Sequence, residues 1–226
     1  MHIPDGFLDP PVFFAAWVLA LGFILPAFRG AQRSLGDRDL PLLSVLTAGV
    51  FAAQMLNFPI IAGTSGHLVG GTLIAVFLGP YATIFSMTVI LVIQALVFGD
   101  GGITALGANI LNMGVIAAGT YYVYVGLRKV WRGQQGAVAA VFVAAWLSVF
   151  LGALACGFVL GISSAFQPYG GAAITIPTMA FWHAFIGVGE GLTTAAVFTY
   201  VSKTRPDMLA LPKIGPLGGG PPGKLG

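Results

Sequence analysis

The sequence predicts an all-α protein that crosses a membrane several times. Of its 226 residues, 57% are hydrophobic and only 8% are charged, whereas soluble domains carry about 25% charged residues. The mean hydropathy is +0.93, and the apolar residues lie in long runs. A backbone inside a bilayer must satisfy its own hydrogen bonds, and helices of about 20 apolar residues do this. We therefore expect a polytopic helical membrane protein.

The chain contains seven apolar runs. The third run is short, and together with the fourth it can be interpreted as one over-long helix that is broken at Gly79-Pro80. Hydropathy alone therefore leaves six or seven spans open. The runs cover residues 12–28, 41–62, 68–79, 80–98, 105–127, 137–160 and 176–201.

The basic residues favour seven transmembrane helices. All ten Lys and Arg residues follow the first, fifth and seventh runs. With seven spans they lie on one side of the membrane, whereas with six the middle cluster lies opposite the first. Because cytoplasmic loops carry an excess of Lys and Arg, the N-terminus is predicted outside and the C-terminus in the cytoplasm. The three clusters are Arg29, Arg33 and Arg38; Arg128, Lys129 and Arg132; and Lys203, Arg205, Lys213 and Lys224.

A single transmembrane domain is predicted over residues 1–201, with its first segment, residues 1–10, outside the membrane. Residues 202–226 are rich in Gly and Pro and predict a cytoplasmic tail. The first ten residues contain no Lys or Arg, so the positively charged start of a signal peptide is absent from them. The scattered basic residues form no stripe of the kind that binds nucleic acid. The lone Cys156 provides neither a disulfide framework nor a cysteine metal site.

Met1 and His2 form a candidate metal-binding group. A free Met1 amine, the deprotonated amide of His2 and the His2 ring can hold one metal ion, in a five-membered chelate ring fused to a six-membered one. Such a group is planar, and planar nitrogen ligands suit Ni(II) or Cu(II). The dipeptide alone has low specificity, because any protein can carry His after its first Met.

A second histidine is predicted at the same outer face. His67 ends the stretch Gly63-Thr64-Ser65-Gly66-His67 after the second run, where it can supply a fourth nitrogen and close a square plane. The outer loops carry Asp5, Asp9 and Asp100 without any Lys or Arg, and such a surface attracts cations. The residues expected to support the ligands are Asn57, Ser65 and Asp5, whereas Gln54, Gln94, Asn109 and Asn112 are expected to hydrogen-bond between helices.

Other polar residues leave alternatives open. Ser65 falls in a G-x-S-G pattern that resembles intramembrane serine proteases, with His183 as its conceivable partner in a dyad. Two helical turns separate His183 from Glu190, so they share a helix face and could form an ion relay within the membrane. A neutral Glu190 that is hydrogen-bonded within the bundle is the favoured interpretation. Small residues at every fourth position from Gly136 to Cys156 suit helix packing within the chain or a docking face for a partner.

Two motifs resemble those of a known family. The stretch Met1-His2-Ile3-Pro4-Asp5-Gly6-Phe7-Leu8 resembles the N-terminus of the CbiM/NikM proteins, most closely NikM. These proteins are the metal-specific S components of energy-coupling factor (ECF) transporters. The stretch from Gln54 to Pro59, followed by residues 63–67, looks like the second signature of the family. The resemblance extends from Met1 to about Val201.

The resemblance implies a six-helix core with an additional N-terminal helix. It also implies that the Met1 amine, the His2 amide, the His2 ring and His67 hold Ni(II) or Co(II) as the transported substrate. The implied partners are a transmembrane T component, two cytoplasmic ATPase subunits and a small accessory membrane subunit. We therefore expect a transporter subunit of the cell membrane, not an enzyme, that captures nickel outside. A cobalt-specific S component for cobalamin biosynthesis is the alternative, because the same ligands serve both metals.

Overall fold

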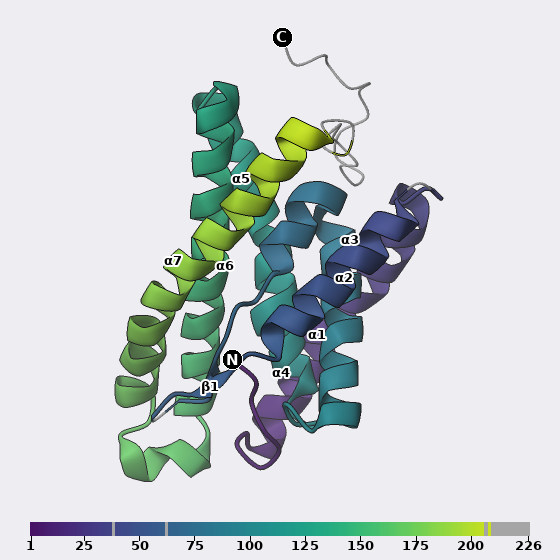
Figure 1. The fold of residues 1–226 in the computed structure, drawn as a ribbon. Coiled ribbons are helices and arrows are strands. Elements are labelled where there is room, and N and C mark those ends of the chain that lie inside the picture. The colour runs from purple at the N-terminus through teal and green to yellow at the C-terminus, as the bar shows by residue number, and fades with distance from the viewer. Residues whose placement is uncertain (38, 62, 206–207, 209–226) are drawn as a thin grey trace.

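The computed structural model describes residues 1–37, 39–61, 63–205 and 208, and in this part of the chain nearly all regular structure is helical (Figure 1). The predicted tail over residues 202–226 lies mostly outside the described residues. The only strands within the described residues, β1 (Phe58–Pro59) and β2 (Ser65–Gly66), pair antiparallel. The α-helices are α1 (Pro10–Ser34), α2 (Leu40–Gln54), α3 (Gly71–Ile93), α4 (Leu106–Ile110), α5 (Ile116–Val130), α6 (Gly133–Gly161) and α7 (Ala172–Thr204).

Among the described residues, five helical stretches are long and apolar enough to cross a membrane. Two of them contain π-helical turns, Gln94–Phe98 at the end of α3 and Leu111–Val115 between α4 and α5. A short 3-10 helix, Ser164–Tyr169, joins α6 to α7. The five stretches are Pro10–Ser34, Gly71–Phe98, Leu106–Val130, Gly133–Gly161 and Ala172–Thr204.

The prediction of one continuous run over residues 41–62 is wrong, because α2 has only 15 residues and ends at Gln54. Beyond Gln54 the apolar residues belong to β1 and to the turn that follows it. Pro59 has no amide hydrogen and does not continue a helix. Hydropathy did not reveal this change, because strands and turns near a membrane also carry apolar side chains.

The chain reverses its direction at Gly79-Pro80, within α3. Gly79 has φ 83° and ψ 175°, which is outside the helical region and is readily adopted only by glycine. The ring of Tyr81 packs against Gly30 near the end of α1, whereas Asp100, which follows the end of the same helical stretch, lies 3.8 Å from the His2 ring near the N-terminus. The predicted break between runs 68–79 and 80–98 is therefore confirmed. The count of seven spans and the sidedness of the two ends remain predictions.

Helices α6 and α7 pack closely through small residues. A side chain at Gly157 or Gly161 would collide with the backbone at the start of α7. Gly187 and Gly191 of α7 lie against Trp146 and Phe142 of α6 in the same way, and close approach of this kind is what small residues allow in membrane helices. In the predicted row of small residues, Ala140, Ala144, Ser148, Gly152 and Cys156 are buried within the chain, which supports packing within the chain over a docking face for a partner.

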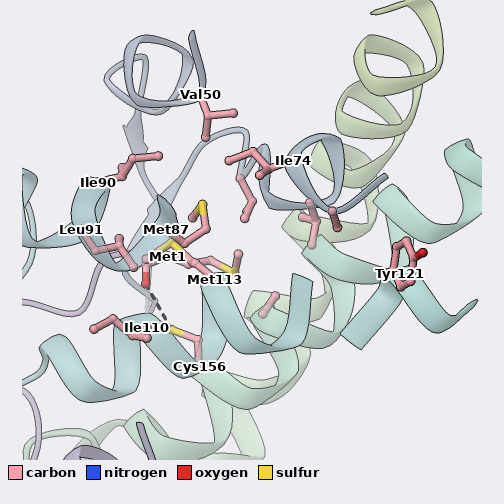
Figure 2. Close-up of a cluster of buried hydrophobic side chains, with 14 of the residues drawn as sticks. Met1, Val50, Ile74, Met87, Ile90, Leu91, Ile110, Met113, Tyr121 and Cys156 are labelled. Atoms are coloured by element: carbon pink, nitrogen blue, oxygen red, sulfur yellow. Dashed lines mark hydrogen bonds between the residues drawn. The ribbon is translucent and has the colours of Figure 1, made fainter. Parts of the chain in front are cut away.

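The first residue of the chain lies inside the bundle. Met1 and Ile3 are both completely buried, with no exposed surface. Figure 2 shows the Met1 side chain beside Met87 and Met113 in the hydrophobic core, with Cys156 reaching its main chain. Met1 thus lies in the core, where its apolar side chain and that of Ile3 hold the terminal amine in place.

Candidate metal centre

The backbone of the N-terminal segment, residues 1–9, is held by hydrogen bonds to other parts of the chain. The Ile3 amide donates to Asn109 Oδ1 at 2.9 Å, and Asn109 Nδ2 donates back to the Ile3 carbonyl at 3.2 Å. The same carbonyl accepts a hydrogen bond from the Gly102 amide at 2.8 Å. Asn109 was predicted to bond between helices, but it grips the N-terminal segment instead. Its hydrophobic surroundings in the sequence gave no signal for this role.

Asp5 fastens the N-terminal segment to the loop after α3. Its carboxylate accepts hydrogen bonds from the Ile103 amide at 3.1 Å and from the Thr104 amide at 2.7 Å, and a further one from the Thr104 hydroxyl. These bonds lower the pKa of the Asp5 carboxyl below its usual value. Asp5 makes no described contact with a candidate ligand, so its support for the site is indirect.

The His67 loop, residues 63–70, brings the second histidine to the N-terminal segment. Its fold depends on three hydrogen bonds from the bundle: Gln54 Nε2 donates to the Val69 carbonyl at 2.6 Å, and the Glu190 carboxylate accepts from the amides of Val69 and Gly70 at 2.9 and 2.6 Å. The ring of His67 bonds through Nδ1 to the Leu68 carbonyl at 2.7 Å. A carbonyl only accepts, so Nδ1 carries the hydrogen and Nε2 presents its lone pair.

The nitrogen atoms of Met1 and His67 meet at the distance that two neighbouring metal ligands require. The Met1 amine lies 2.7 Å from His67 Nε2, and the rings of His2 and His67 have their centroids 4.6 Å apart. Metal–nitrogen bonds of about 2.0 Å at right angles place adjacent nitrogens about 2.8 Å apart. The spacing therefore suits one edge of a square-planar site.

Ser65 lies beside the chelating group formed by the Met1 amine, the His2 amide and the His2 ring, which is called the claw below. Its carbonyl and its hydroxyl accept hydrogen bonds from the Met1 amine at 2.5 and 3.0 Å, and the hydroxyl also accepts from the His2 amide at 3.2 Å. Ser65 therefore orients both the amine and the amide that the sequence predicts as ligands. Ser65 therefore contacts two of the candidate ligands directly, and its supporting role stays a prediction.

The ring of His2 is buried but has no fixed partner. Its side chain is only 3% exposed, and neither Nδ1 nor Nε2 has a hydrogen-bond partner within the described residues. The closest charged atom is Asp100 Oδ2, 3.8 Å from Nε2. Buried polar atoms are nearly always satisfied, and an unsatisfied one calls for an explanation. A ligand bound at this ring would provide it.

Burial keeps the candidate ligands neutral. It lowers the pKa of the Met1 amine from 8.0 to about 5 and that of His2 from 6.5 to about 3. Burial also holds the pKa of His67 well below its usual value, and the nearby amine and His2 act in the same direction. Nitrogen ligands must give up their protons to bind a metal. These three groups have done so at pH 7, before any ion arrives.

A cavity of about 510 Å³ leads to this group of nitrogens. Burial raises the pKa of the Asp100 carboxyl at its wall, while Asn57 Nδ2 donates to Asp100 Oδ2 at 2.8 Å. Asn57 thus supports the site through Asp100 and not by touching a ligand. The lining includes His2, Asp5, Asn57, Ser65 and Asp100.

The predicted polar pair of α7 is not joined directly. His183 Nδ1 bonds to the Met179 carbonyl at 2.8 Å, and Glu190 bonds to the backbone of the His67 loop. The His183 ring also reaches the Ser65 backbone, but no hydrogen bond joins it to the Ser65 hydroxyl among the side chains that the structure describes. In the same part of the chain, no three His, Cys, Asp or Glu side chains gather as a metal site, so a metal here requires the main-chain nitrogens.

Several known proteins are similar to this chain over most of its length. Residues 2–208 match the model of a family described as the cobalt uptake substrate-specific transmembrane region, CbiM. A putative fused nickel transport protein, NikMN, of Archaeoglobus fulgidus is 43% identical over 92% of this chain and 68% of its own length. A putative metal transport protein of Haloquadratum walsbyi is 46% identical over 92% of this chain and 93% of its own.

A solved structure shares the fold. The crystal structure of a truncated transition metal transporter superposes with a TM-score of 0.83 at 32% sequence identity. The match covers 90% of this chain and 99% of the other. The arrangement of helices described above is therefore the one found in a transition metal transporter.

Proposed function

The chain belongs to the CbiM family of substrate-specific transmembrane regions, and from this premise we propose that it captures Ni(II) outside the cell as the specificity subunit of an ATP-driven ECF importer. It is a multi-pass membrane protein of a metal-uptake family. The observation that carries the proposal is the approach of the Met1 amine to His67 Nε2 at 2.7 Å. That contact brings together two neighbouring nitrogens of the proposed square plane, one from each of the two segments that form it.

Capture follows from the chemistry of the claw. The ion enters through the cavity, loses its water and binds the neutral amine and the imidazole nitrogens. The His2 amide then releases its proton and becomes the fourth nitrogen ligand. Affinity alone would favour Cu(II), because the Irving–Williams order places it above Ni(II). A planar set that contains a deprotonated amide suits low-spin Ni(II), so geometry contributes to the selection.

Nickel is proposed ahead of cobalt on the strength of the relatives. The fused nickel transport protein of Archaeoglobus fulgidus is 43% identical to this chain, whereas a putative cobalt transport protein of Haloquadratum walsbyi is 34% identical. The four nitrogens themselves serve either ion. Co(II) is therefore the alternative cargo, and a direct comparison of the two affinities decides between them.

We further propose that other subunits supply the energy. The sequence contains no G-x-x-x-x-G-K-[ST] phosphate-binding loop, the pattern that cradles nucleotide phosphates in many ATPases. The proposed partners are a transmembrane T component, two cytoplasmic ATPase subunits and a small accessory membrane subunit. In this arrangement the chain binds the ion and performs no catalysis.

The protease alternative has less support. The Ser65 hydroxyl already accepts hydrogen bonds from the Met1 amine and the His2 amide. A serine nucleophile needs a base within hydrogen-bond reach of its hydroxyl, and among the described residues His183 reaches the Ser65 backbone and not the hydroxyl. The contacts of Ser65 are those of a residue that orients the claw.

The test is the metal content of the protein with a native N-terminus. Protein with its purification tag at the C-terminus is expected to bind about one Ni(II) per chain, as measured by elemental analysis after dialysis. The same tag placed before Met1 removes the free amine and is expected to abolish binding. Full occupancy behind an N-terminal tag would sink the proposal. Loss of function in Ser65→Ala with no effect of His2→Ala would instead support the protease.

A further inference from the structure

The His2 ring needs a hydrogen-bond acceptor when it binds a metal. The six-membered chelate ring closes only through Nδ1, because Nε2 is too far from the backbone. A neutral imidazole that binds through Nδ1 carries its hydrogen on Nε2. Metal-binding histidines almost always donate that hydrogen to a carboxylate, a carbonyl or water. A metal-bound His2 ring therefore requires an acceptor close to its Nε2.

Asp100 is the acceptor in reach. Its Oδ2 lies 3.8 Å from His2 Nε2, about 1 Å beyond a normal hydrogen bond. The two groups are both shielded, with His2 3% and the Asp100 side chain 18% exposed. A small rotation of the unpartnered His2 ring, of the kind that binding at Nδ1 imposes, would close this gap.

The Asp100 carboxylate is held in advance by its own neighbours. Asn57 Nδ2 donates to Oδ2 at 2.8 Å, and the Asp100 amide donates to the Gln94 carbonyl at 2.9 Å. The next residue, Gly101, has φ +93° and lies beside His2, since a Cβ added there would stand 3.4 Å from His2 Nδ1. The loop therefore places the carboxylate beside His2 through fixed backbone contacts.

The Asp100 carboxylate can also compensate the positive charge of the metal-bound site. A divalent ion bound by one deprotonated amide and three neutral nitrogens leaves one positive charge in a buried place. Burying an unpaired charge is costly. The carboxylate of Asp100 is the nearest compensating charge, and one negative charge makes the loaded centre neutral.

We propose that Asp100, held by Asn57, is a positioning residue that accepts the Nε2–H of His2 in the metal-bound state and neutralises the loaded site. This inference rests on the proposed function, since it requires His2 to bind the ion through Nδ1. It assigns Asn57 its role as the residue that orients Asp100.

The experiment uses Ni(II) alone with the full chain and its native N-terminus. Asp100→Ala is expected to weaken Ni(II) binding about 10- to 100-fold, the usual effect of removing such a partner. Asp100→Asn should weaken it less, because its amide oxygen still accepts the hydrogen bond but carries no charge. Asp9→Asn is the matched control: the Asp9 carboxylate accepts from the Ser164 amide and hydroxyl and from no candidate ligand among the described residues, and the Ni(II) affinity of this variant should stay within about twofold of the parent.

A second measurement separates positioning from general damage. Planar low-spin Ni(II) is diamagnetic, so NMR of 15N-labelled His2 reports the Nε2–H of the loaded protein directly. This hydrogen should exchange slowly with water in the parent protein and quickly in Asp100→Ala. Where Asp100→Ala fails to fold, Asp100→Asn carries the same comparison. Unchanged affinity and unchanged exchange would overturn the role of Asp100 while His2→Ala still abolishes binding. Binding retained in His2→Ala would overturn the proposed function itself.

Discussion

The N-terminal segment and the His67 loop each bring one histidine to the same place, but the bundle holds them in different ways. The N-terminal segment is anchored by the buried side chains of Met1 and Ile3, and its His2 ring is free at both nitrogens. In the His67 loop the ring is bonded at Nδ1 to the Leu68 carbonyl, and Glu190 fixes the backbone that follows.

In the proposed site, His67 is therefore ordered before the ion binds, whereas His2 becomes ordered only when the ion binds. His67 presents the lone pair of Nε2 in a fixed direction before any ion arrives, so little ordering is left for the binding step. His2 closes the chelate only when the metal binds, and its ring then becomes fixed. In such a site the His67 side is already formed before binding, and the His2 side remains open to the ion.

The largest effect should come from removing each histidine in turn. If four ligands share the roughly 10–16 kcal/mol of a structural zinc site, each contributes about 3 kcal/mol, or a hundredfold in affinity. His67→Ala should therefore weaken Ni(II) binding about 100-fold, because the three nitrogens of the claw remain and water takes the fourth place. His2→Ala removes the chelate ring as well and should leave no measurable binding in titration calorimetry.

Thr199→Val is the control for this pair of variants. It removes a hydroxyl that donates to the Ala195 carbonyl of its own helix, α7, and should retain Ni(II) binding. The comparison breaks down if His67→Ala abolishes binding while His2→Ala keeps it. In that case the His67 loop, and not the N-terminal claw, would hold the ion.

A smaller effect is expected from loosening the His67 loop at Glu190. In Glu190→Gln one carboxylate oxygen becomes an amide NH₂, which faces a backbone N–H and cannot accept its bond. Leaving such a buried group unsatisfied costs about 1–3 kcal/mol. The melting temperature should fall, and Ni(II) affinity should fall several-fold because His67 loses its support.

Thr193→Val is a suitable control on the same helix. Thr193 bonds only to the Gly189 carbonyl of its own helix and is exposed, so its replacement should leave both quantities unchanged. An unchanged melting temperature in Glu190→Gln would show that the carboxylate is not what holds the loop. A lower melting temperature with unchanged affinity would show that the loop does not control His67.

The sequence predicted the parts of the site that depend on short-range geometry. The chelate of Met1 and His2 needs only two adjacent residues, and the pattern of basic residues placed His67 at the same face. The roles of Asp100 and Asn109 were missed, because each contacts a segment about 100 residues away. Such contacts depend on how the helices pack, and neither the hydropathy nor the charge pattern of the sequence predicts which distant residues meet.

The same distinction explains the errors in the fold. The break at Gly79-Pro80 was visible because both residues act on their own backbone. The end of α2 was not, since the residues after Gln54 are as apolar as those before it. Glu190 was correctly favoured as a hydrogen-bonded group, but its partners, the amides of the His67 loop, have no side-chain signature.

The smallest effect, and the sharpest, is the dependence of Ni(II) affinity on pH. A metal ion displaces every proton that its ligands still carry, so affinity rises with pH. The pKa of the buried Met1 amine is lowered to about 5 and that of His2 to about 3, and both groups are therefore neutral from pH 6 to 7.5. Only the His2 amide releases a proton in this range. Log affinity should thus rise by about one unit per pH unit.

An exposed N-terminus would give a different slope. With an ordinary amine pKa near 8, about two protons would leave for each ion between pH 6 and 7.5, and log affinity would rise about twofold more steeply. Calorimetry in buffers of different ionisation enthalpy counts these protons directly. A count near one supports an amine that burial has already neutralised, and the count should rise toward two only below about pH 5, where the amine takes up its proton. A count near two at pH 7 would mean that the N-terminal segment is open to water until the ion arrives, so that the ion would order both the terminal amine and the His2 ring.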